Sequence, residues 1–349
     1  MRIVASITTI PSRLLNICPV IRSLLDQTRP FDRVYVNVPQ ISRRGVSYPL
    51  EEFFELLQAE GLRGTVGRDD ELCSDPVVDR LHINVVDYDL GPIMKTLPVL
   101  HLEHDPLTRI VSFDDDHLVN PRTAEMLERY IGEHPDKALS LSGYTVGCFP
   151  FLFEYVWNVS EVSAVDWILG VSIIVYRRDW LNFEDLSDYN HIEDPSLRQM
   201  FIKNDDHWIN YWLARHGVIR AVVPERQSAY LQPLDSQGGI SQGPGFLEEN
   251  YRLADYLRQQ GIYRQPNIKP YYTAGAVVLL ILLGIGLGLA ILLGLGVPLT
   301  AALVTAILIY CLVFLLLGNV VRALGSLRYY LLVPVIVLLV GLGYSLTWD

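Results

Sequence analysis

The sequence predicts an α/β domain with a mostly parallel central sheet and flanking helices, followed by a C-terminal transmembrane helical region. Short apolar runs alternate with amphipathic stretches over about the first 225 residues. This alternation is typical of parallel sheets, whose strands are connected by helices. From residue 273 onward nearly every residue is apolar, which is typical of helices that cross a bilayer.

The expected elements follow from the spacing of apolar residues. Buried strands are expected at 2–7, 33–38, 81–86, 110–113, 138–142, 172–176 and 218–223. Helices are expected at 17–25, 50–58, 93–102, 121–134, 203–213 and 246–260, where apolar side chains recur every three or four residues. Loops are expected at 61–80, 143–165, 181–196 and 224–245, the last as a mobile flap over a site.

Composition narrows the possible partners and compartment. The chain of 349 residues has a formal net charge of −11, which argues against nucleic acid as a partner. Its 4 cysteines are scattered without metal-binding spacing and suit a reducing compartment.

Three parts are expected along the chain: a globular domain at 1–245, an amphipathic interface helix and juxtamembrane linker at 246–272, and a transmembrane region at 273–349. Within the last, spans of about 273–297, 299–317 and 329–348 suit a hydrocarbon core of about 30 Å. The N-terminus does not resemble a secretory signal. Arginine and lysine residues precede the first span, and two arginines lie between the second and third, so we expect an integral membrane protein with a cytoplasmic globular domain.

Three consecutive carboxylates follow the apolar strand at 110–113. On an extended backbone Asp114 and Asp116 would share a face while Asp115 would point elsewhere. Two neighbouring carboxylates at the end of a strand suit Mg²⁺ or Mn²⁺, completed by diphosphate oxygens and water. The alternative is an acidic turn that only ends the strand.

The ends of the parallel strands should bring three loops together, at 8–13, 87–95 and 114–117. The first holds Arg13 and the second Lys95, and each could neutralise a phosphate beside the metal. Either could instead be a solvated surface charge.

Two further segments contain candidate site residues. Trp167 precedes Gly170 beside a buried strand and could stack on a sugar, with core packing as the alternative. Asp205 and Asp206 open a helix, where the helix dipole favours carboxylates. Asp205 could be only a cap, whereas Asp206 in the first turn could act as a general base.

Together these residues carry a resemblance to a known family. Residues 1 to about 225 resemble a nucleotide-sugar glycosyltransferase of the GT-A fold, close to family 2. The resemblance is carried, in order, by Thr8-Thr9-Ile10-Pro11-Ser12-Arg13, Asp89-Leu-Gly-Pro-Ile-Met-Lys95, Phe113-Asp-Asp-Asp-His117, Trp167-Ile-Leu-Gly170 and Asp205-Asp-His-Trp-Ile-Asn-Tyr-Trp-Leu213. It implies a Rossmann-like, mostly parallel sheet.

The resemblance also implies roles for individual residues. Asp206 would deprotonate the acceptor hydroxyl beside Asp205, which replaces the family's glutamate, and Asp116 with Asp114 would hold Mn²⁺ or Mg²⁺. Trp167 and Gly170 would bind the acceptor. The implied donor-binding residues are Thr8, Pro11, Arg13, Asp89, Lys95, Asp114 and Asp115.

The implied reaction is a direct, inverting displacement that transfers one sugar. The donor would be a UDP- or GDP-sugar and the acceptor a glycan or a lipid-linked molecule at the membrane lipid surface. The Gln-x-x-Arg-Trp signature of processive synthases is absent from the sequence, which favours a single transfer. A sugar-phosphate nucleotidyltransferase is the alternative enzyme, although Thr8–Arg13 contains no glycine for a phosphate loop. A catalytically silent membrane scaffold of the same fold is the alternative outside enzymes.

Overall fold

The structure of the protein is a computed structural model. It describes residues 1–67, 80–146, 153–170, 173–224, 230–234, 245–264 and 296. The chain divides into two compact units, Met1–Gln265 and Pro266–Asp349. Among the described residues, no helix combines the length and apolarity needed to cross a bilayer. The expected spans at 273–297, 299–317 and 329–348 lie outside the described residues, apart from residue 296.

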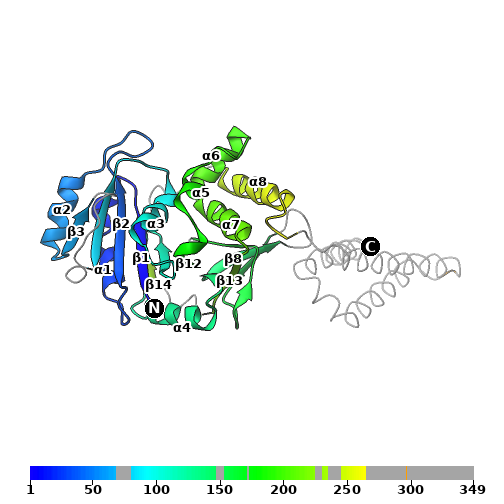
Figure 1. The fold of residues 1–349 in the computed structure, drawn as a ribbon, viewed down its shortest axis with the longest axis horizontal. Helices are drawn as coiled ribbons and strands as arrows, with labels where there is room; N and C mark the ends of the chain where they lie inside the picture. Colours follow the sequence, from blue (N-terminus) through cyan, green and yellow to red (C-terminus); the bar gives the residue numbers. More distant parts are fainter. Residues whose placement is uncertain are drawn as a thin grey trace. The chain divides into compact units, whose positions relative to one another are not determined.

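A nine-stranded sheet forms the centre of the first unit, in the order β10-β13-β7-β12-β5-β1-β2-β4-β3 (Figure 1). Its strands are β1 (Ile3–Thr8), β2 (Arg33–Pro39), β3 (Gly64–Gly67), β4 (Leu81–Val86), β5 (Arg109–Phe113), β7 (Lys137–Ser140), β10 (Ser163–Ala164), β12 (Ile173–Arg177) and β13 (Ile219–Val222). Neighbours from β5 to β3 are parallel, as are β7 and β13, whereas β12 runs antiparallel to both its neighbours. The prediction of a mostly parallel sheet flanked by helices is confirmed.

Helices cover the two faces of this sheet because side chains alternate along each strand. The odd-numbered residues of β1 pack with α1 (Cys18–Leu25), α2 (Leu50–Ala59) and α4 (Thr123–Glu133). Val4 and the opposite face pack with α3 (Leu97–Leu102), α5 (Phe183–Ser187), α6 (Pro195–Lys203), α7 (Asp205–Arg215) and α8 (Phe246–Gln259). Figure 1 shows α5 to α8 grouped together, away from α1 and α2.

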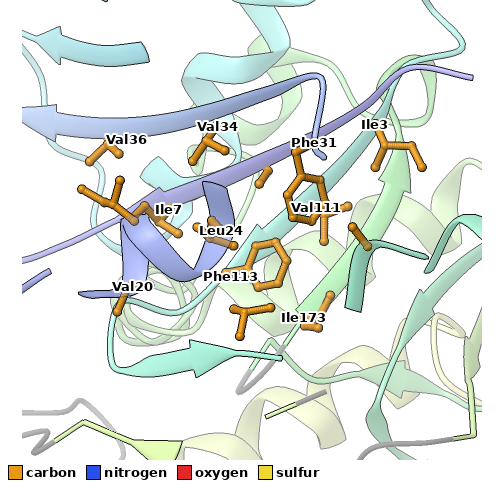
Figure 2. Packing of buried hydrophobic residues seen from close by; sticks show 14 of the residues in the cluster. Ile3, Ile7, Val20, Leu24, Phe31, Val34, Val36, Val111, Phe113 and Ile173 are labelled. Carbon is orange, nitrogen blue, oxygen red and sulfur yellow. The ribbon is translucent and has the colours of Figure 1, made fainter. Parts of the chain in front are cut away.

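The first face is an aliphatic core with two aromatic rings at its centre (Figure 2). Phe31 and Phe113 meet edge to face at 5.7 Å between ring centroids. Around them Ile7, Leu24 and Val111 are fully buried. Each such side chain contributes roughly 1.5–3 kcal/mol by leaving water, so this core fixes β1 and β5 beside each other.

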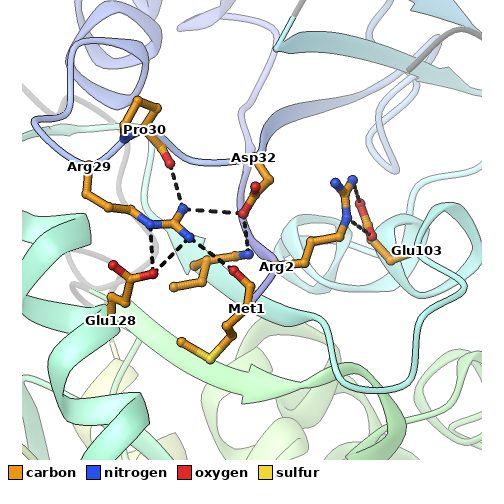
Figure 3. Close-up of polar contacts among 8 residues, drawn as sticks. Met1, Arg2, Arg29, Pro30, Asp32, Glu103 and Glu128 are labelled. Atoms are coloured by element: carbon orange, nitrogen blue, oxygen red, sulfur yellow. Dashed lines mark hydrogen bonds and ion pairs between the residues drawn. The ribbon is translucent and has the colours of Figure 1, made fainter. Parts of the chain in front are cut away.

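Ion pairs secure the N-terminal edge of the sheet (Figure 3). The Arg29 guanidinium donates to Glu128 of α4 and to Asp32 before β2. Arg2 donates through two nitrogens to Glu103 at 2.7 Å. These contacts tie the start of β1 to the connections on both sides of the sheet.

The order in which strands are added to the sheet reverses at β1. Strands β2, β4 and β3 are added on one side, and β5 then pairs with β1 on the other. In parallel sheets a crevice opens at this reversal, outside the carboxyl ends of the strands. The loops after β1 and β5 therefore border the natural ligand site of the fold.

The structure corrects four expected loops. The 143–165 region contributes to a second sheet, in the order β11-β8-β9, formed by β8 (Ser142–Val146), β9 (Phe153–Trp157) and β11 (Trp167–Ile168). The 61–80 region contains β3, and 181–196 contains α5 and the start of α6. Within 224–245, β14 (Tyr230–Pro233) pairs with β6 (His117–Val119). The rest of these regions includes 68–79, 147–152, 225–229 and 235–244, which lie outside the described residues.

Candidate active site

Hydrogen bonds connect the end of β1 and the loop after it to β2 and to the acidic loop after β5. Thr8 Oγ1 donates to the Asn37 carbonyl of β2 at 2.8 Å. Thr9 Oγ1 donates to Asp115 Oδ2 at 2.5 Å, and Tyr48 donates to the Thr9 carbonyl. Sequence reasoning missed the Thr9 contact because it singled out Thr8 in this motif. Pro11 lies in the turn that follows.

The three carboxylates after β5 have different partners from those that the predicted alternation implies. Because β5 ends at Phe113, Asp114 to Asp116 leave the strand and the alternation of faces stops there. Asp115 and Asp116 both approach Arg13 Nη1, at 2.7 and 3.5 Å. Asp114 instead accepts from Lys95 at 2.9 Å. The prediction that Asp115 turns away from Asp116 was therefore wrong, because both carboxylates meet the same guanidinium nitrogen.

Asp116 is the one of the three acids whose pKa is lowered. His117 Nδ1 lies 2.6 Å from Asp116 Oδ1, and together with Arg13 it lowers the pKa of Asp116 against the opposing effect of burial. Burial raises the pKa of both Asp114 and Asp115. Sequence reasoning gave His117 no role of its own, although it belongs to the acidic motif.

Lys95 joins this acidic loop to α7. The lysine lies in a 3₁₀ turn (Pro92–Lys95) and is buried. Its Nζ contacts Asp114 at 2.9 Å and Asp205 at 3.0 Å, and Asp206 adds to its electrostatic surroundings. These carboxylates raise the pKa of Lys95 well above its ordinary value despite its burial. Lys95 thus organises three acids, and its predicted contact with a donor phosphate stays a prediction.

Asp206 lies directly against Gly170. A Cβ at position 170 would overlap Asp206 Oδ1 and lie 3.1 Å from Lys95 Nζ, so only glycine leaves room for this contact. Burial, Asp205 and Asp114 raise the pKa of Asp206 to about 7, while Lys95 and the Gly170 N–H oppose the rise. Asp206 can therefore exchange a proton near neutral pH.

The first turn of α7 is held by the ion pair between Asp205 and Lys95 rather than by a side-chain cap. Asn204 precedes the helix without a capping hydrogen bond from its side chain. Asp205 is buried against Lys95 instead. Asn210, one turn later, is fully buried and bonds to both the N–H and the carbonyl of Ile168 in β11. Asn210 was not foreseen, because its contacts are to backbone distant in sequence.

Asp89 organises the loop that leads to Lys95. Its carboxylate accepts from the Arg43 and Gly91 N–H groups, each at 2.7 Å. Gly91 has a φ of 85°, which favours glycine, and a Cβ there would lie 3.0 Å from the Ile202 carbonyl. A direct role of Asp89 with a donor stays a prediction.

Trp167 belongs to the packing of the domain. Its side chain is only 4% exposed, and it stacks with Tyr144 and Tyr263 at 4.9 Å between centroids in each case. Burial among these rings leaves no room for a sugar, so we do not retain the prediction that Trp167 stacks on the acceptor. Gly170, predicted with it, lies beside Asp206 as described above.

The whole cluster carries excess negative charge. Lys95, Arg13 and His117 are its basic side chains, against the five carboxylates Asp114, Asp115, Asp116, Asp205 and Asp206. Within the described residues, no group of three or more His, Cys, Asp or Glu side chains could hold a metal ion on its own. Asp116 with Asp114 offers carboxylate oxygens suited to a hard cation, provided that further ligands come from a substrate and water.

The fold and site define an α/β domain with a cluster of carboxylates near the reversal of its sheet. No known family model matches the chain, and no curated protein matches it. Similar solved structures are those of TarS from S. aureus.

TarS 1-349 in complex with UDP-GlcNAc is 14% identical with a TM-score of 0.45, covering 74% of this chain and 67% of that one. Its complex with UDP is 15% identical with a TM-score of 0.42, covering 74% and 66%. A further TarS structure is 15% identical with a TM-score of 0.41, covering 67% of this chain and 37% of that one.

Proposed function

We propose that this chain is a metal-dependent, inverting glycosyltransferase of the GT-A fold. It moves a sugar from a nucleotide-sugar donor, a UDP- or GDP-sugar, to an acceptor hydroxyl or a lipid-linked acceptor. The observation that carries the proposal is the pairing of two chemical functions at one crevice. Asp206 has its pKa raised to about 7. The adjacent Asp205 shares Lys95 with Asp114, which follows the acidic end of β5.

Asp206 is the general base in this proposal. As an anion it accepts the proton of the acceptor hydroxyl while that oxygen attacks the anomeric carbon from the face opposite the leaving group. Lys95 pairs with the neighbouring Asp205, and the absence of a side chain at Gly170 gives the base space. A positioned base contributes a factor of about 10²–10⁴ to the rate.

Asp116 and Asp114 would hold Mn²⁺ or Mg²⁺. When bound, the ion would neutralise charge on the diphosphate of the leaving group, which is often a large contribution to catalysis. Arg13 lies 3.5 Å from Asp116 and keeps that carboxylate ionised and oriented. Thr8, Pro11, Asp89 and Asp115 complete the proposed donor side of the crevice.

We further propose that residues 273–349 anchor the enzyme in a membrane with the catalytic domain in the cytoplasm. The support is the apolar sequence of this region and the arginine and lysine residues that flank its expected spans. An anchor of this kind would keep the site near lipid-linked acceptors.

A hydrolysis screen tests the proposal. The purified full chain is incubated with individual UDP- and GDP-sugars, with Mg²⁺, Mn²⁺ or EDTA, and released nucleoside diphosphate is measured. We expect one donor to be hydrolysed slowly, with a metal requirement. Asp116→Ala should remove metal-dependent binding of the nucleoside diphosphate. Absence of such binding in the unmodified chain would favour a silent scaffold.

Asp206→Asn then separates the acceptor classes. With a hydroxyl acceptor the variant should bind the nucleoside diphosphate normally but lose about 10²–10⁴ in transfer rate. A polyprenyl phosphate acceptor needs no strong base, so turnover would remain nearly intact.

A further inference from the structure

Five aromatic rings form a continuous row beside the proposed catalytic base. Tyr263 stacks on Trp167 and Trp167 on Tyr144, each at 4.9 Å between centroids. Tyr144 contacts Tyr155 at 5.2 Å, and Tyr155 stacks on Trp157 at 6.3 Å with 26° between the planes. We call these five residues the aromatic row.

The aromatic row runs from the interior to the surface. Tyr263 and Trp167 are 1% and 4% exposed, whereas Tyr155 and Trp157 are 40% and 46% exposed. The inner rings are explained by core packing. The outer pair is held nearly parallel, and about half of each large side chain remains open to water, so the outer pair is the part that could meet a ligand.

Strand pairing places the outer pair close to the reaction site. Trp157 of β9 lies opposite Ser142 of β8, and the Leu169 N–H donates to the Ser142 carbonyl. The backbones of Trp157 and Leu169 are therefore two strand spacings apart, a distance of about 10 Å. The next residue, Gly170, touches Asp206. A short oligosaccharide with one hydroxyl beside Asp206 could therefore also reach Tyr155 and Trp157.

The charge of this segment favours a neutral ligand. Residues 153–170 contain Glu154, Glu161 and Asp166 but no Lys or Arg, and Asp166 is paired with Arg264 at 3.0 Å. Glu154 adjoins Tyr155 in β9 and would repel an anionic phosphate or membrane surface, since such surfaces attract basic segments. Flat aromatic faces with polar tips suit a ligand that has one apolar face and many hydroxyl groups. A neutral sugar ring has this character.

We propose that Tyr155 and Trp157 form a stacking subsite for a neutral sugar ring of the acceptor, so that the acceptor is a glycan. The inference rests on the proposed glycosyltransferase function and specifies its acceptor. Tyr144 and Trp167 act as positioning residues, because they hold the outer pair through the rings beneath it.

Binding of oligosaccharides without donor tests the subsite directly. The full chain in detergent is titrated with neutral gluco-, manno- and chito-oligosaccharides, and affinity is measured by calorimetry and by tryptophan fluorescence. We expect at least one series to bind, with affinity rising with length. Trp157→Ala and Tyr155→Ala should each weaken this binding by about tenfold or more, as for other aromatic contacts.

Matched variants separate stacking from general damage. Trp157→Phe keeps a flat ring and should retain most of the affinity. Leu107→Ala removes a side chain that is 61% exposed outside the aromatic row, and it should bind oligosaccharides and hydrolyse donor as the unmodified chain does. Equal affinity in Trp157→Ala and the unmodified chain would overturn the subsite.

Two further outcomes would also overturn it. If no oligosaccharide binds while the donor screen succeeds, the subsite fails and the proposed function stands. If brominated phospholipids quench the part of the fluorescence that Trp157→Phe removes, and no sugar changes it, the outer pair contacts lipid instead. Sugar binding at Trp157 in a chain without nucleotide binding would keep the subsite and overturn the transferase.

Discussion

Asp206 has a pKa suited to a general base because its negative charge is buried beside other carboxylates. It faces Asp205, Asp114, Lys95 and the Gly170 N–H, and its pKa is raised to about 7. A base must be ionised, so transfer to a hydroxyl acceptor should rise about tenfold per pH unit below 7 and level off above it. The pH profile of kcat/KM measures this, and the apparent value belongs to the coupled cluster. A rate that is flat from pH 5 to 8 would exclude Asp206 as the base.

The same carboxyl should make the fold less stable as pH rises. Its pKa is about 7 in the folded state against 3.8 as the ordinary value, so between these values the folded state binds more protons. The free energy of unfolding then falls with rising pH, by at most about 1.4 kcal/mol per unit. Urea melts at pH 5 and 8 should show a smaller fall for Asp206→Asn than for the unmodified chain. Equal slopes would contradict the raised pKa.

Gly170 is required by space rather than by backbone conformation. Gly170→Ala places a methyl group on Asp206 Oδ1 and beside Lys95 Nζ. Displacing a base by about 1 Å costs on the order of 10² in rate, so we expect a loss of this size in transfer. The control is Gly132→Ala in α4, where a Cβ meets nothing within 4 Å. It should keep full activity and gain up to about 1 kcal/mol in stability.

Which site residues could be predicted depended on local chemistry. Asp114, Asp116, Asp205 and Asp206 were visible because each follows an apolar strand or lies in a first helical turn, and Lys95 because it lies in a loop at the carboxyl ends of the strands. Their orientations were not, since β5 ends one residue before the acids begin. Trp167 was misassigned because one sequence cannot show that Tyr263, nearly a hundred residues later, covers its ring.

At the scale of elements, one asparagine holds α7 against β11. The Asn210 amide accepts from the Ile168 N–H at 2.9 Å and donates to the Ile168 and Asp206 carbonyls at 2.7 and 2.6 Å. Asn210→Asp keeps the shape but replaces two donated bonds with repulsion. We expect a loss of about 2–5 kcal/mol in stability and a fall in kcat, because α7 carries the base. Thermal melts and kcat below the melting temperature measure both.

The same substitution in an exposed loop is its control. Asn190→Asp should change stability by less than about 0.5 kcal/mol, because Asn190 is exposed. If Asn210→Asp behaves like Asn190→Asp, α7 is held by its apolar face alone and the asparagine is not needed.

Long elements were predictable and short paired ones were not. The apolar periods of α1, α2, α4 and the central strands identify them without any partner. Strand β3 is only four residues long and is stabilised by pairing with β4 at the edge of the sheet. The aromatic and glycine residues of 143–165 suggested a loop, although Tyr144 and Tyr155 are in fact cross-strand partners in β8 and β9. Short strands stabilised by pairing with a neighbouring strand leave no period to read.

At the scale of the whole molecule, the catalytic and anchoring roles should be separable. Every proposed site residue lies in the unit Met1–Gln265, and the expected spans lie in Pro266–Asp349. We expect a chain ending at Gln265 to stay in the supernatant after ultracentrifugation and to keep metal-dependent nucleotide binding. The full chain should sediment with membranes and resist an alkaline wash, because helices that cross a bilayer are released only by detergent.

A matched pair of full-length variants tells loss of anchoring from loss of the site. Asp116→Ala should remain in the membrane fraction and lose metal-dependent nucleotide binding. Replacing Leu303 and Leu308 in the second expected span with Arg should release part of the chain or block its insertion, since each buried charge costs about 2.5–3.5 kcal/mol. A full chain that the alkaline wash releases would exclude the membrane anchor. The acidic crevice would be unaffected by that result, because its contacts all lie within the first unit.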